Sequence, residues 1–338
     1  MPVINEQLGA YSDLFMLLAA FAYAAALVVF AWDLAKSNAT IRSIEQEVLR
    51  QEADQLATVG GGSASTRPAG GPALVDESMA YTAASGQRSM ARIAVVLTWL
   101  AAAIHTVAVV TRAIAAARVP WGNMYEFLST GALIVALVYL IALLRKDLRF
   151  MGVFVTLLVT VMLCAATMGF PTPVGHLVPA LQSPWIIIHV SIAVLASSLF
   201  TISFVASVVQ LIQHRRQARL AAGGEDRLPF LRLVPSAGAL ENFAYRINAV
   251  SFVLWTFTVM AGAIWAEAAW GRYWGWDPKE VWSFVIWVVY AGYLHARATR
   301  GWTGVRSAWL SIVGYACIIF NFTVVNIYFS GLHSYAGV

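Results

Sequence analysis

Residues 185–212 read WIIIHVSIAVLASSLFTISFVASVVQLI and contain no Asp, Glu, Lys or Arg. This run is longer than the ~20 apolar residues with which an α-helix crosses the hydrocarbon core of a bilayer. Within a bilayer the backbone must form its hydrogen bonds internally, so such a run is expected to be a helix. Hydropathy places seven further runs of this kind along the chain: Leu14–Trp32, Ile93–Val110, Phe127–Leu144, Met151–Phe170, Ala249–Ala266, Pro278–His295 and Ala308–Phe329. The sequence therefore predicts an all-α integral membrane protein with about eight transmembrane helices.

The composition of the whole chain supports this class. Of the 338 residues, 60% are hydrophobic and only 12% are charged, and the mean hydropathy is +0.71. A water-soluble globular enzyme of this length does not normally carry such a balance. The net charge of +5 comes from Lys and Arg in the loops, where it sets orientation and does not indicate nucleic-acid binding. Cys164 and Cys317 are isolated within apolar runs, so thiol–disulfide chemistry within the chain is not expected.

Lysine and arginine are distributed unevenly between the alternate loops. One set of loops carries 18 of these residues, and the opposite set carries four: Arg112, Arg118, Arg272 and Lys279. Because cytoplasmic loops are enriched in Lys and Arg, the richer set is predicted to face the cytoplasm. An even number of spans then places both termini on the extracytoplasmic side.

Three regions follow from this topology: a first transmembrane helix in residues 1–33, a cytoplasmic loop in residues 34–90, and a core in residues 91–338. The loop contains a helix-like stretch, Ile41–Ala57, and then the sequence GGGSASTRPAGGP over Gly60–Pro72. That Gly- and Ser-rich composition cannot bury enough apolar surface to order itself, so it predicts a flexible linker. The helix-like stretch either packs on a partner or is solvated.

Tryptophan is concentrated in the extracytoplasmic loop between the sixth and seventh spans. Residues 270–282 read WGRYWGWDPKEVW, and they contain Trp270, Trp274, Trp276 and Trp282. One interpretation is an aromatic belt at the membrane surface, where indole side chains are common. A belt, however, spreads its aromatic residues over many helix ends, whereas this segment gathers them in one loop. The concentration favours a surface that binds a ligand.

The same segment contains the signals of a helix start. Asp277 is predicted to be the N-cap, Pro278 occupies the first helical position, and Glu280 completes a capping box. A capped helix would hold the tryptophan segment rigidly. A rigid aromatic surface at the edge of a membrane suits a large, flat, apolar ligand, and a haem macrocycle also needs axial ligands, most often histidine.

Three of the six histidines are candidate iron ligands. His189 lies in the first turns of the fifth span and His333 follows the end of the eighth, so both are near the extracytoplasmic surface. His295 lies 17 residues after Pro278, about 25 Å deeper at ~1.5 Å per residue, near the cytoplasmic leaflet. An ionisable residue at that depth is a functional candidate, and its depth indicates a second, inner site.

Alternatives to these assignments stay open. Each of the three candidates could instead be a structural histidine whose ring bonds a backbone carbonyl. His176, in an outer loop, competes with His189, and His105, in mid-membrane, is either a ligand or a packed polar residue. His214 lies in the basic run HRRQAR and belongs to the cytoplasmic positive charge.

Four stretches of the chain together resemble one family. Residues 274–297 (WGWDPKEVWSFVIWVVYAGYLHAR) resemble the tryptophan-rich signature of the cytochrome c assembly family known as CcsA, ResC or CcsB, the multispanning component of the second maturation system for cytochromes c. Residues 120–127 (PWGNMYEF), 177–193 (LVPALQSPWIIIHVSIA) and 331–336 (GLHSYA) look like the family's other landmarks, in the same order. The resemblance covers most of the chain except the long loop before Arg88.

For the site, this resemblance implies that His189 and His333 are the external axial ligands of haem b (iron protoporphyrin IX), held against the Trp274–Trp282 segment. It also implies that His295 corresponds to the family's histidine inside the membrane. A companion subunit resembling ResB is then expected to supply the second ligand of the inner site, for which His105 is only a weak substitute.

For the function, the resemblance implies cytochrome c biogenesis at a bacterial plasma membrane, with the active face outside the cytoplasm. Haem would enter near His295, pass to the outer surface and be presented to the CxxCH thiols of an apocytochrome, with a thioredoxin-like protein as the thiol reductant. The chain would be the haem-presenting subunit of a cytochrome c synthase, or haem lyase. No residue is assigned a catalytic role, because the thioether chemistry belongs to haem and to the thiols.

Other functions compete with this one. The chain could be a haem exporter or chaperone without attachment activity, related through the tryptophan-rich segment to the CcmC and CcmF proteins. It could also be a small-solute transporter or a structural subunit of a respiratory complex, although the lack of inverted repeats weakens the transporter interpretation.

The outer loops also carry charged and polar candidates. Arg118, Arg272 and Lys279 either pair with haem propionates or are solvated surface charges. Asn123 and Glu126 are expected to shape the outer loop.

Overall fold

The computed structural model describes residues 4–59 and 89–333, and within them all regular secondary structure is helical. Short helical turns occupy helix ends and loops: η1 (Arg149–Met151), η2 (Ala165–Gly169), η3 (Pro179–Leu181) and η4 (Pro229–Leu233). The predicted all-α class is confirmed. The α-helices are α1 (Glu6–Val59), α3 (Ser89–Ala116), α4 (Met124–Leu143), α5 (Gly152–Cys164), α6 (Pro184–Ala221), α7 (Ala237–Trp270), α8 (Pro278–Arg300), α9 (Val305–Phe322) and α10 (Val324–Tyr328).

Seven segments in the described part of the chain are long and apolar enough to cross a membrane. They are Glu6–Ser37, Ser89–Ala116, Met124–Leu143, Arg149–Gly169, Pro184–Ala221, Ala237–Trp270 and Val305–Tyr328. The remaining predicted span is α8, whose 23 residues reach ~35 Å at ~1.5 Å per residue but include several Trp, Tyr and terminal charged residues. The chain is a multi-pass membrane protein.

The first helix is longer than its apolar run. The sequence predicts a span that ends at Trp32 and a separate helix-like stretch at Ile41–Ala57, whereas the structure has one continuous helix, α1. Residues 33–59 contain neither Gly nor Pro, so nothing in the backbone chemistry stops the helix where the hydropathy falls. The predicted linker Gly60–Pro72 lies outside the described residues.

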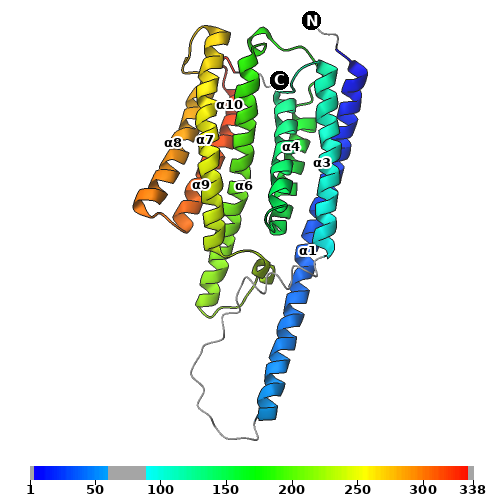
Figure 1. Ribbon diagram of the computed structural model, residues 1–338, viewed down its shortest axis with the longest axis vertical. Helices are drawn as coiled ribbons and strands as arrows, with labels where there is room; N and C mark the ends of the chain where they lie inside the picture. Colours follow the sequence, from blue (N-terminus) through cyan, green and yellow to red (C-terminus); the bar gives the residue numbers. More distant parts are fainter. Residues whose placement is uncertain (1–3, 60–88, 334–338) are drawn as a thin grey trace.

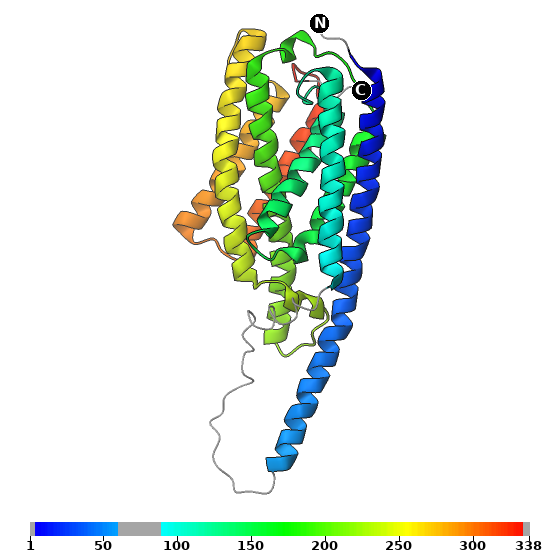
Figure 2. The ribbon, with the colours of Figure 1, turned by 45° about the vertical axis from the view of Figure 1, so that its right-hand side comes forward.

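The bundle consists of two groups of helices (Figures 1 and 2). In the first group α1 packs along α3 and α5, and α4 packs against α5; in the second group α6 packs along α7, and α8 and α6 both pack against α9. Contacts between α4 and α6 join the two groups. The first core contains Tyr23 and Tyr139, and the second contains Phe200, Trp255 and Tyr290.

Small residues allow α1 and α3 to approach closely. The alanines Ala94, Ala101, Ala108 and Ala115 recur every seven residues on α3 and are fully buried. Ser12 of α1 donates a hydrogen bond to the Ala108 carbonyl at 2.8 Å. Apolar burial gives no driving force between helices in lipid, so this close packing and its hydrogen bonds hold the pair together.

Several connections meet at one end of the bundle, which we call the outer end (Figure 1). The Asn5 N–H bonds the Ala115 carbonyl in the last turn of α3, and the Leu332 N–H bonds the Asp277 carboxylate at 2.6 Å. Both ends of the described chain therefore lie at the outer end. The connections are residues 117–123, 170–183, 271–277 and 331–333.

A buried cluster of charges joins the outer ends of α1, α3 and α4. Glu126 is fully buried and accepts hydrogen bonds from Arg112 at 3.1 Å and from Arg118 at 2.7 Å. Arg112, 1% exposed, also donates to the Thr172 carbonyl at 2.7 Å and lies 3.5 Å from Asp13 of α1. A single carboxylate thus compensates two guanidinium groups, and it holds the loop before α4 against the loop after α5.

We expect Glu126→Gln to destabilise the protein by about 3–5 kcal/mol, because it leaves two buried or partly buried guanidinium groups without their shared carboxylate. The measurement is the thermal unfolding of the detergent-purified protein, followed by circular dichroism. Asp13→Asn is the matched control, because Asp13 is 58% exposed and its loss should cost less than about 1 kcal/mol. Equal losses in the two variants would contradict this account of the cluster.

Candidate functional site

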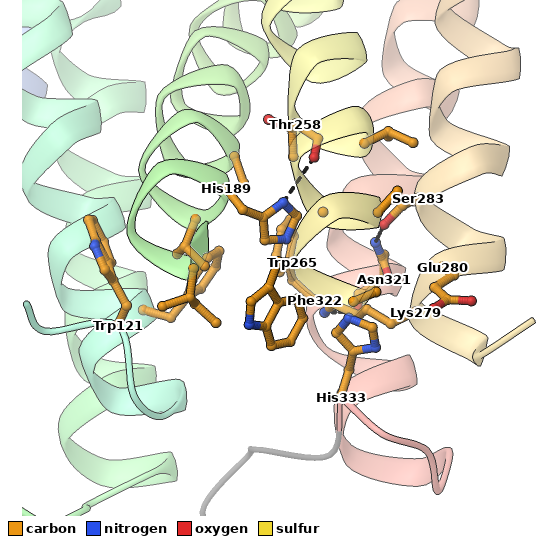
Figure 3. A pocket seen from close by; sticks show the side chains of 18 of the residues that line it. Trp121, His189, Thr258, Trp265, Lys279, Glu280, Ser283, Asn321, Phe322 and His333 are labelled. Atoms are coloured by element: carbon orange, nitrogen blue, oxygen red, sulfur yellow. Dashed lines mark hydrogen bonds between the residues drawn. The ribbon is translucent and has the colours of Figure 1, made fainter. Parts of the chain in front are cut away.

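An open pocket lies at the outer end of the bundle and encloses about 1090 Å³, its mouth included. It is bounded by the start of α4, by α6 to α10 and by the turn that contains His333 (Figure 3). Aromatic and aliphatic side chains dominate its walls, among them Trp121, Ile186, Trp255, Trp265, Trp274 and Phe322.

His189 reaches this pocket from the second turn of α6, which begins at Pro184 behind the N-cap Ser183. Its Nδ1 lies 2.9 Å from the Thr258 carbonyl of α7 (Figure 3). Because a carbonyl only accepts, Nδ1 must carry the proton, and Nε2 keeps its lone pair. The ring stacks on Trp265 at 5.9 Å between centroids and 10° between planes. His189 thus has a fixed tautomer and a fixed orientation.

Gly262 makes room for the His189 ring. A Cβ atom at this position of α7 would lie 2.7 Å from His189 Cε1 and 2.9 Å from Nδ1. The imidazole therefore occupies the space that any other residue would fill with its side chain. This close approach lets the ring reach the Thr258 carbonyl one turn earlier on the same helix.

His333 reaches the pocket from the turn that follows α10. Its Nδ1 lies 3.0 Å from Asp277 Oδ1, and its ring contacts Trp265 and Trp270 edge-on at 5.3 and 4.8 Å. The carboxylate is an acceptor, so Nδ1 of His333 donates and Nε2 is left as the possible metal ligand. The two histidines, 144 positions apart, share one indole, Trp265, and point into the same pocket (Figure 3).

Asp277 connects His333 to the start of α8. Its carboxylate accepts the Lys279 N–H at 3.0 Å as the helix cap, and Glu280 in return accepts the Asp277 N–H at 3.0 Å. The second Asp277 oxygen accepts the Leu332 N–H. Burial by itself would raise the pKa of the Asp277 carboxyl, but its hydrogen bond from His333 and its backbone donors hold the pKa below the ordinary value. The predicted capping box is confirmed, and it also orients a histidine.

The tryptophans of residues 270–282 occupy four different environments. Trp274 lines the pocket, and Trp270 packs on the His333 ring. Trp276 is 76% exposed, with a φ of 58°, and Trp282 packs against Phe320 at 4.2 Å. The segment therefore contributes one indole to the pocket wall and a second that supports a histidine.

Three tryptophans that line the pocket, Trp121, Trp255 and Trp265, have no role predicted from the sequence. Trp265 lies within α7, is 1% exposed, and donates from Nε1 to the Ala180 carbonyl. Trp121 lies in the PWGNMYEF stretch and forms part of the opposite wall (Figure 3). Trp121 lies in a stretch that resembles a family landmark, whereas Trp255 and Trp265 lie in an apolar run that carries no signal for a site.

The other histidines lie away from the pocket. His176 is exposed in the loop before α6, and His295 is exposed toward the far end of α8. His105 is fully buried beside Tyr23 at 5.8 Å between ring centroids, and neither of its ring nitrogens has a hydrogen-bond partner. The structure therefore brings together His189 and His333 only.

One of the outer cations borders the pocket. Lys279 Nζ donates to the Asn321 carbonyl at 2.8 Å and to Asn326 Oδ1 at 2.9 Å, and it lies 4.4 Å from the centre of the Phe322 ring. Arg118 is bound by Glu126 and by the Gly175 carbonyl instead. Of the cations predicted to meet an anionic group, Lys279 is the one that lines the pocket.

His189 and His333 suit a metal that is held in a macrocycle better than a bare metal ion. In the described part of the chain no three His, Cys, Asp or Glu side chains gather as a metal site. Two imidazoles with open Nε2 atoms suit an iron whose other four ligands come from a porphyrin, and the apolar walls suit its ring. Several polar atoms in the pocket wall also lack partners: Trp121 Nε1, Thr258 Oγ1, Glu280 Oε1 and Asn321 Oδ1.

Comparison with known proteins identifies the family. The family model for the cytochrome C assembly protein matches residues 121–333, a range that contains both pocket histidines and the tryptophan segment. This chain belongs to that family. The expectation from the sequence resemblance is confirmed.

Curated relatives of this family member carry one name, cytochrome c biogenesis protein CcsA. The chain is 34% identical to the Guillardia theta protein over 253 residues, which cover 70% of this chain and 83% of the relative. It is 36% identical to the Synechococcus elongatus protein over 255 residues (64% and 78%) and 33% identical to a Prochlorococcus marinus protein over 272 residues (73% and 85%). The chain therefore acts in cytochrome c biogenesis, as a multi-pass membrane protein of a family that handles haem.

We expect Gly262→Ala to lower the free energy of unfolding by about 1–3 kcal/mol, because the added methyl group overpacks the site and pushes His189 off the Thr258 carbonyl. Gly292→Ala on α8 is the control, since a Cβ there meets nothing within 4 Å. It should stabilise its helix by up to about 1 kcal/mol. Thermal unfolding of both variants without added haem makes the comparison. A stabilised Gly262→Ala protein would show that His189 does not need this space.

Proposed function

We propose that this chain binds haem b between His189 and His333 and presents it, outside the cytoplasm, for covalent attachment to CxxCH apocytochromes. One observation carries the proposal. Two histidines from distant parts of the chain have their Nδ1 atoms engaged by fixed acceptors, and both offer Nε2 to the same aromatic pocket. Metal-binding histidines commonly donate their second N–H to a carbonyl or a carboxylate in this way.

In this proposal each residue has a role in binding and orientation. His189 and His333 hold the haem iron, Trp265 and Trp274 border the macrocycle, and Lys279 offers a cation to a carboxylate of the ligand. Haem supplies the vinyl groups, across which each cysteine S–H adds to form a C–S and a C–H bond without net oxidation. The protein contributes position and the exclusion of competing reactions.

The two ligands differ in how firmly the fold holds them. His189 lies within α6, whereas His333 lies in the turn after α10, and its side chain is 17% exposed. Attachment requires one ligand to give way to the histidine of the CxxCH motif. We assign this exchange to His333, because moving its turn breaks the Asp277 contacts and leaves the long helices in place.

The proposal extends to a second site and to partners. His295 is exposed on α8 toward the inner end, where it is available to a neighbouring subunit. We propose that a ResB-like membrane subunit completes an inner haem site there, and that a thioredoxin-like protein keeps the apocytochrome thiols reduced. The outer end would face away from the cytoplasm of a bacterial plasma membrane, in accord with the 18-to-4 distribution of Lys and Arg.

We expect His189→Ala and His333→Ala each to abolish the bis-histidine absorption spectrum and the formation of holocytochrome, because each removes one axial ligand. Added imidazole should restore part of the spectrum by entering the vacated position. The measurement is haem content and covalent cytochrome haem, with the chain co-expressed with its partner. His176→Ala, an exposed outer histidine, is the control and should keep both signals. Full haem content in either pocket variant would refute the ligand pair.

The same reconstitution separates attachment from export. If the wild-type chain with its ResB-like partner binds haem but forms no thioether bond, the chain is a haem exporter or chaperone. If holocytochrome forms only when both chains are present, the chain is one subunit of a haem lyase.

We expect Asp277→Asn to weaken haem binding by about 10–100-fold while α8 still forms, because an asparagine still caps the helix but loses one of the two acceptor oxygens. The haem should then show an altered axial-ligand spectrum instead of simple loss of the protein. Glu267→Gln, an exposed carboxylate near the end of α7, is the control for charge at the outer end. An unchanged spectrum and affinity in Asp277→Asn would mean that His333 does not depend on this carboxylate.

A further inference from the structure

One wall of the haem pocket contains a buried hydrogen-bond donor that has no partner. Trp121 lies in the loop before α4 and lines the pocket on the side opposite Lys279 and Glu280 (Figure 3). Its Nε1 atom is buried, and no group in the described part of the chain accepts its hydrogen. An indole N–H can only donate, so this atom needs an acceptor. A buried donor that has none is destabilising for the free protein.

Two other indoles of the same pocket differ from Trp121 in this respect. Trp255 donates from Nε1 to the Ser283 carbonyl at 3.1 Å, and Trp265 donates from Nε1 to the Ala180 carbonyl at 3.1 Å. Both hydrogen bonds lie within the protein, so neither indole needs a ligand to satisfy its N–H. Of these three indoles, Trp121 alone keeps its N–H for a ligand.

The loop before α4 holds Trp121 in place. The Trp121 backbone N–H bonds the Val119 carbonyl at 3.0 Å. On either side of it, Arg118 Nη1 and the Gly122 N–H donate to the same Glu126 oxygen at 2.7 and 2.8 Å. Both sides of Trp121 are therefore attached to one buried carboxylate. A ligand that meets this N–H needs little reordering of the loop, which favours binding.

The other unpartnered atoms in the pocket wall need a different kind of group. Glu280 Oε1 and Asn321 Oδ1 accept hydrogen bonds, so a carboxylate cannot satisfy them, and the Thr258 hydroxyl can either donate or accept. Trp121 Nε1 is the one among these four atoms that can only donate. Its partner must therefore bring an acceptor, and an anionic acceptor forms the stronger bond.

We propose that Trp121 Nε1 donates a hydrogen bond to a propionate carboxylate of haem. This assignment rests on the proposed haem site. The four ring nitrogens of iron protoporphyrin are bound to the iron, so its two propionates are the acceptors that it offers to an N–H group. Lys279 is assigned to one carboxylate, and Trp121 supplies a donor for the other. A macrocycle held at these groups cannot turn about the axis through its iron, which fixes its vinyl groups for the incoming thiols.

The test compares haem b with its dimethyl ester, which keeps the iron and the ring but replaces both carboxylates with neutral esters. Each porphyrin is titrated into the haem-free, full-length protein in detergent, and the bis-histidine absorption spectrum reports binding. The variant is Trp121→Phe, which keeps an aromatic ring in the wall but has no N–H. Trp255→Phe is the matched control, because its N–H is bonded by the Ser283 carbonyl.

We expect Trp121→Phe to bind haem b about tenfold or more weakly than the wild type does, because it loses a hydrogen bond to a charged group. The loss of affinity for the dimethyl ester should be clearly smaller, since a neutral ester accepts more weakly. Trp255→Phe should change both affinities by the same factor. Equal losses for the two porphyrins in Trp121→Phe would overturn the proposal.

Two further outcomes distinguish a wrong propionate assignment from a wrong haem site. If the wild type gives no bis-histidine spectrum with haem b, the haem site itself is wrong, and Trp121 has no propionate to meet. If Trp121→Phe binds haem b as the wild type does but forms less holocytochrome, the N–H meets the apocytochrome polypeptide, and the propionate assignment is overturned.

Thermal unfolding of the haem-free proteins provides a readout that does not involve haem. Both variants lose the same indole atoms, but Trp255→Phe also leaves the Ser283 carbonyl without its donor. We therefore expect Trp121→Phe to be the less destabilised of the two. A larger loss in Trp121→Phe would mean that its N–H already has a partner in the free protein, which would overturn the proposal.

Discussion

The carboxylate of Asp277 is the contact on which the outer pocket depends. One oxygen accepts hydrogen bonds from the Lys279 N–H, which caps α8, and from Nδ1–H of His333. The other oxygen accepts the Leu332 N–H. A helix start and a segment more than fifty residues later are therefore fixed by one buried side chain. Because a carboxylate only accepts, it also decides which nitrogen of His333 carries the proton. The same carboxylate therefore caps the start of α8 and orients His333 toward the pocket.

His189 is oriented by a different set of contacts. Its acceptor is a backbone carbonyl, that of Thr258, and the ring reaches it only because Gly262 has no side chain. His189 thus depends on the packing of α6 against α7, whereas His333 depends on α8 and on the end of the chain. Trp265 contacts both rings, so the two independent supports meet at one indole. A shift of α6 against α7, or of α8 against the end of the chain, would therefore change the contacts of Trp265 with a pocket histidine.

The sequence predicts the helices well because an apolar run in lipid must form its backbone hydrogen bonds internally, and a helix does so. It predicts the start of α8 because Asp277, Pro278 and Glu280 form a local pattern. It fails at the end of the first span, where hydropathy falls but helix propensity continues into the rest of α1. The roles of Gly262 and Trp265 are not visible in the sequence, since both lie in an apolar run and acquire a role only through the packing of α7 against α6. The tryptophan segment is a related case: sequence proximity gathers four indoles in one loop, but of these four it is Trp274 that lines the pocket, and Trp276 has a positive φ.

Basic residues at both ends of the bundle take part in ion pairs within the protein. Two of the four basic residues counted on the outer side, Arg112 and Arg118, are compensated by the buried Glu126, and Lys279 is bonded within the wall of the pocket. Little basic charge is therefore left at the outer surface. At the inner end, by contrast, Arg92, Arg145 and Lys146 are exposed beside apolar side chains. Some inner cations are paired as well, since Arg216 and Arg232 share Asp226 and Arg297 bonds Glu241. The positive-inside rule therefore depends on the number of basic residues at each end of the bundle and not on how many of them are unpaired.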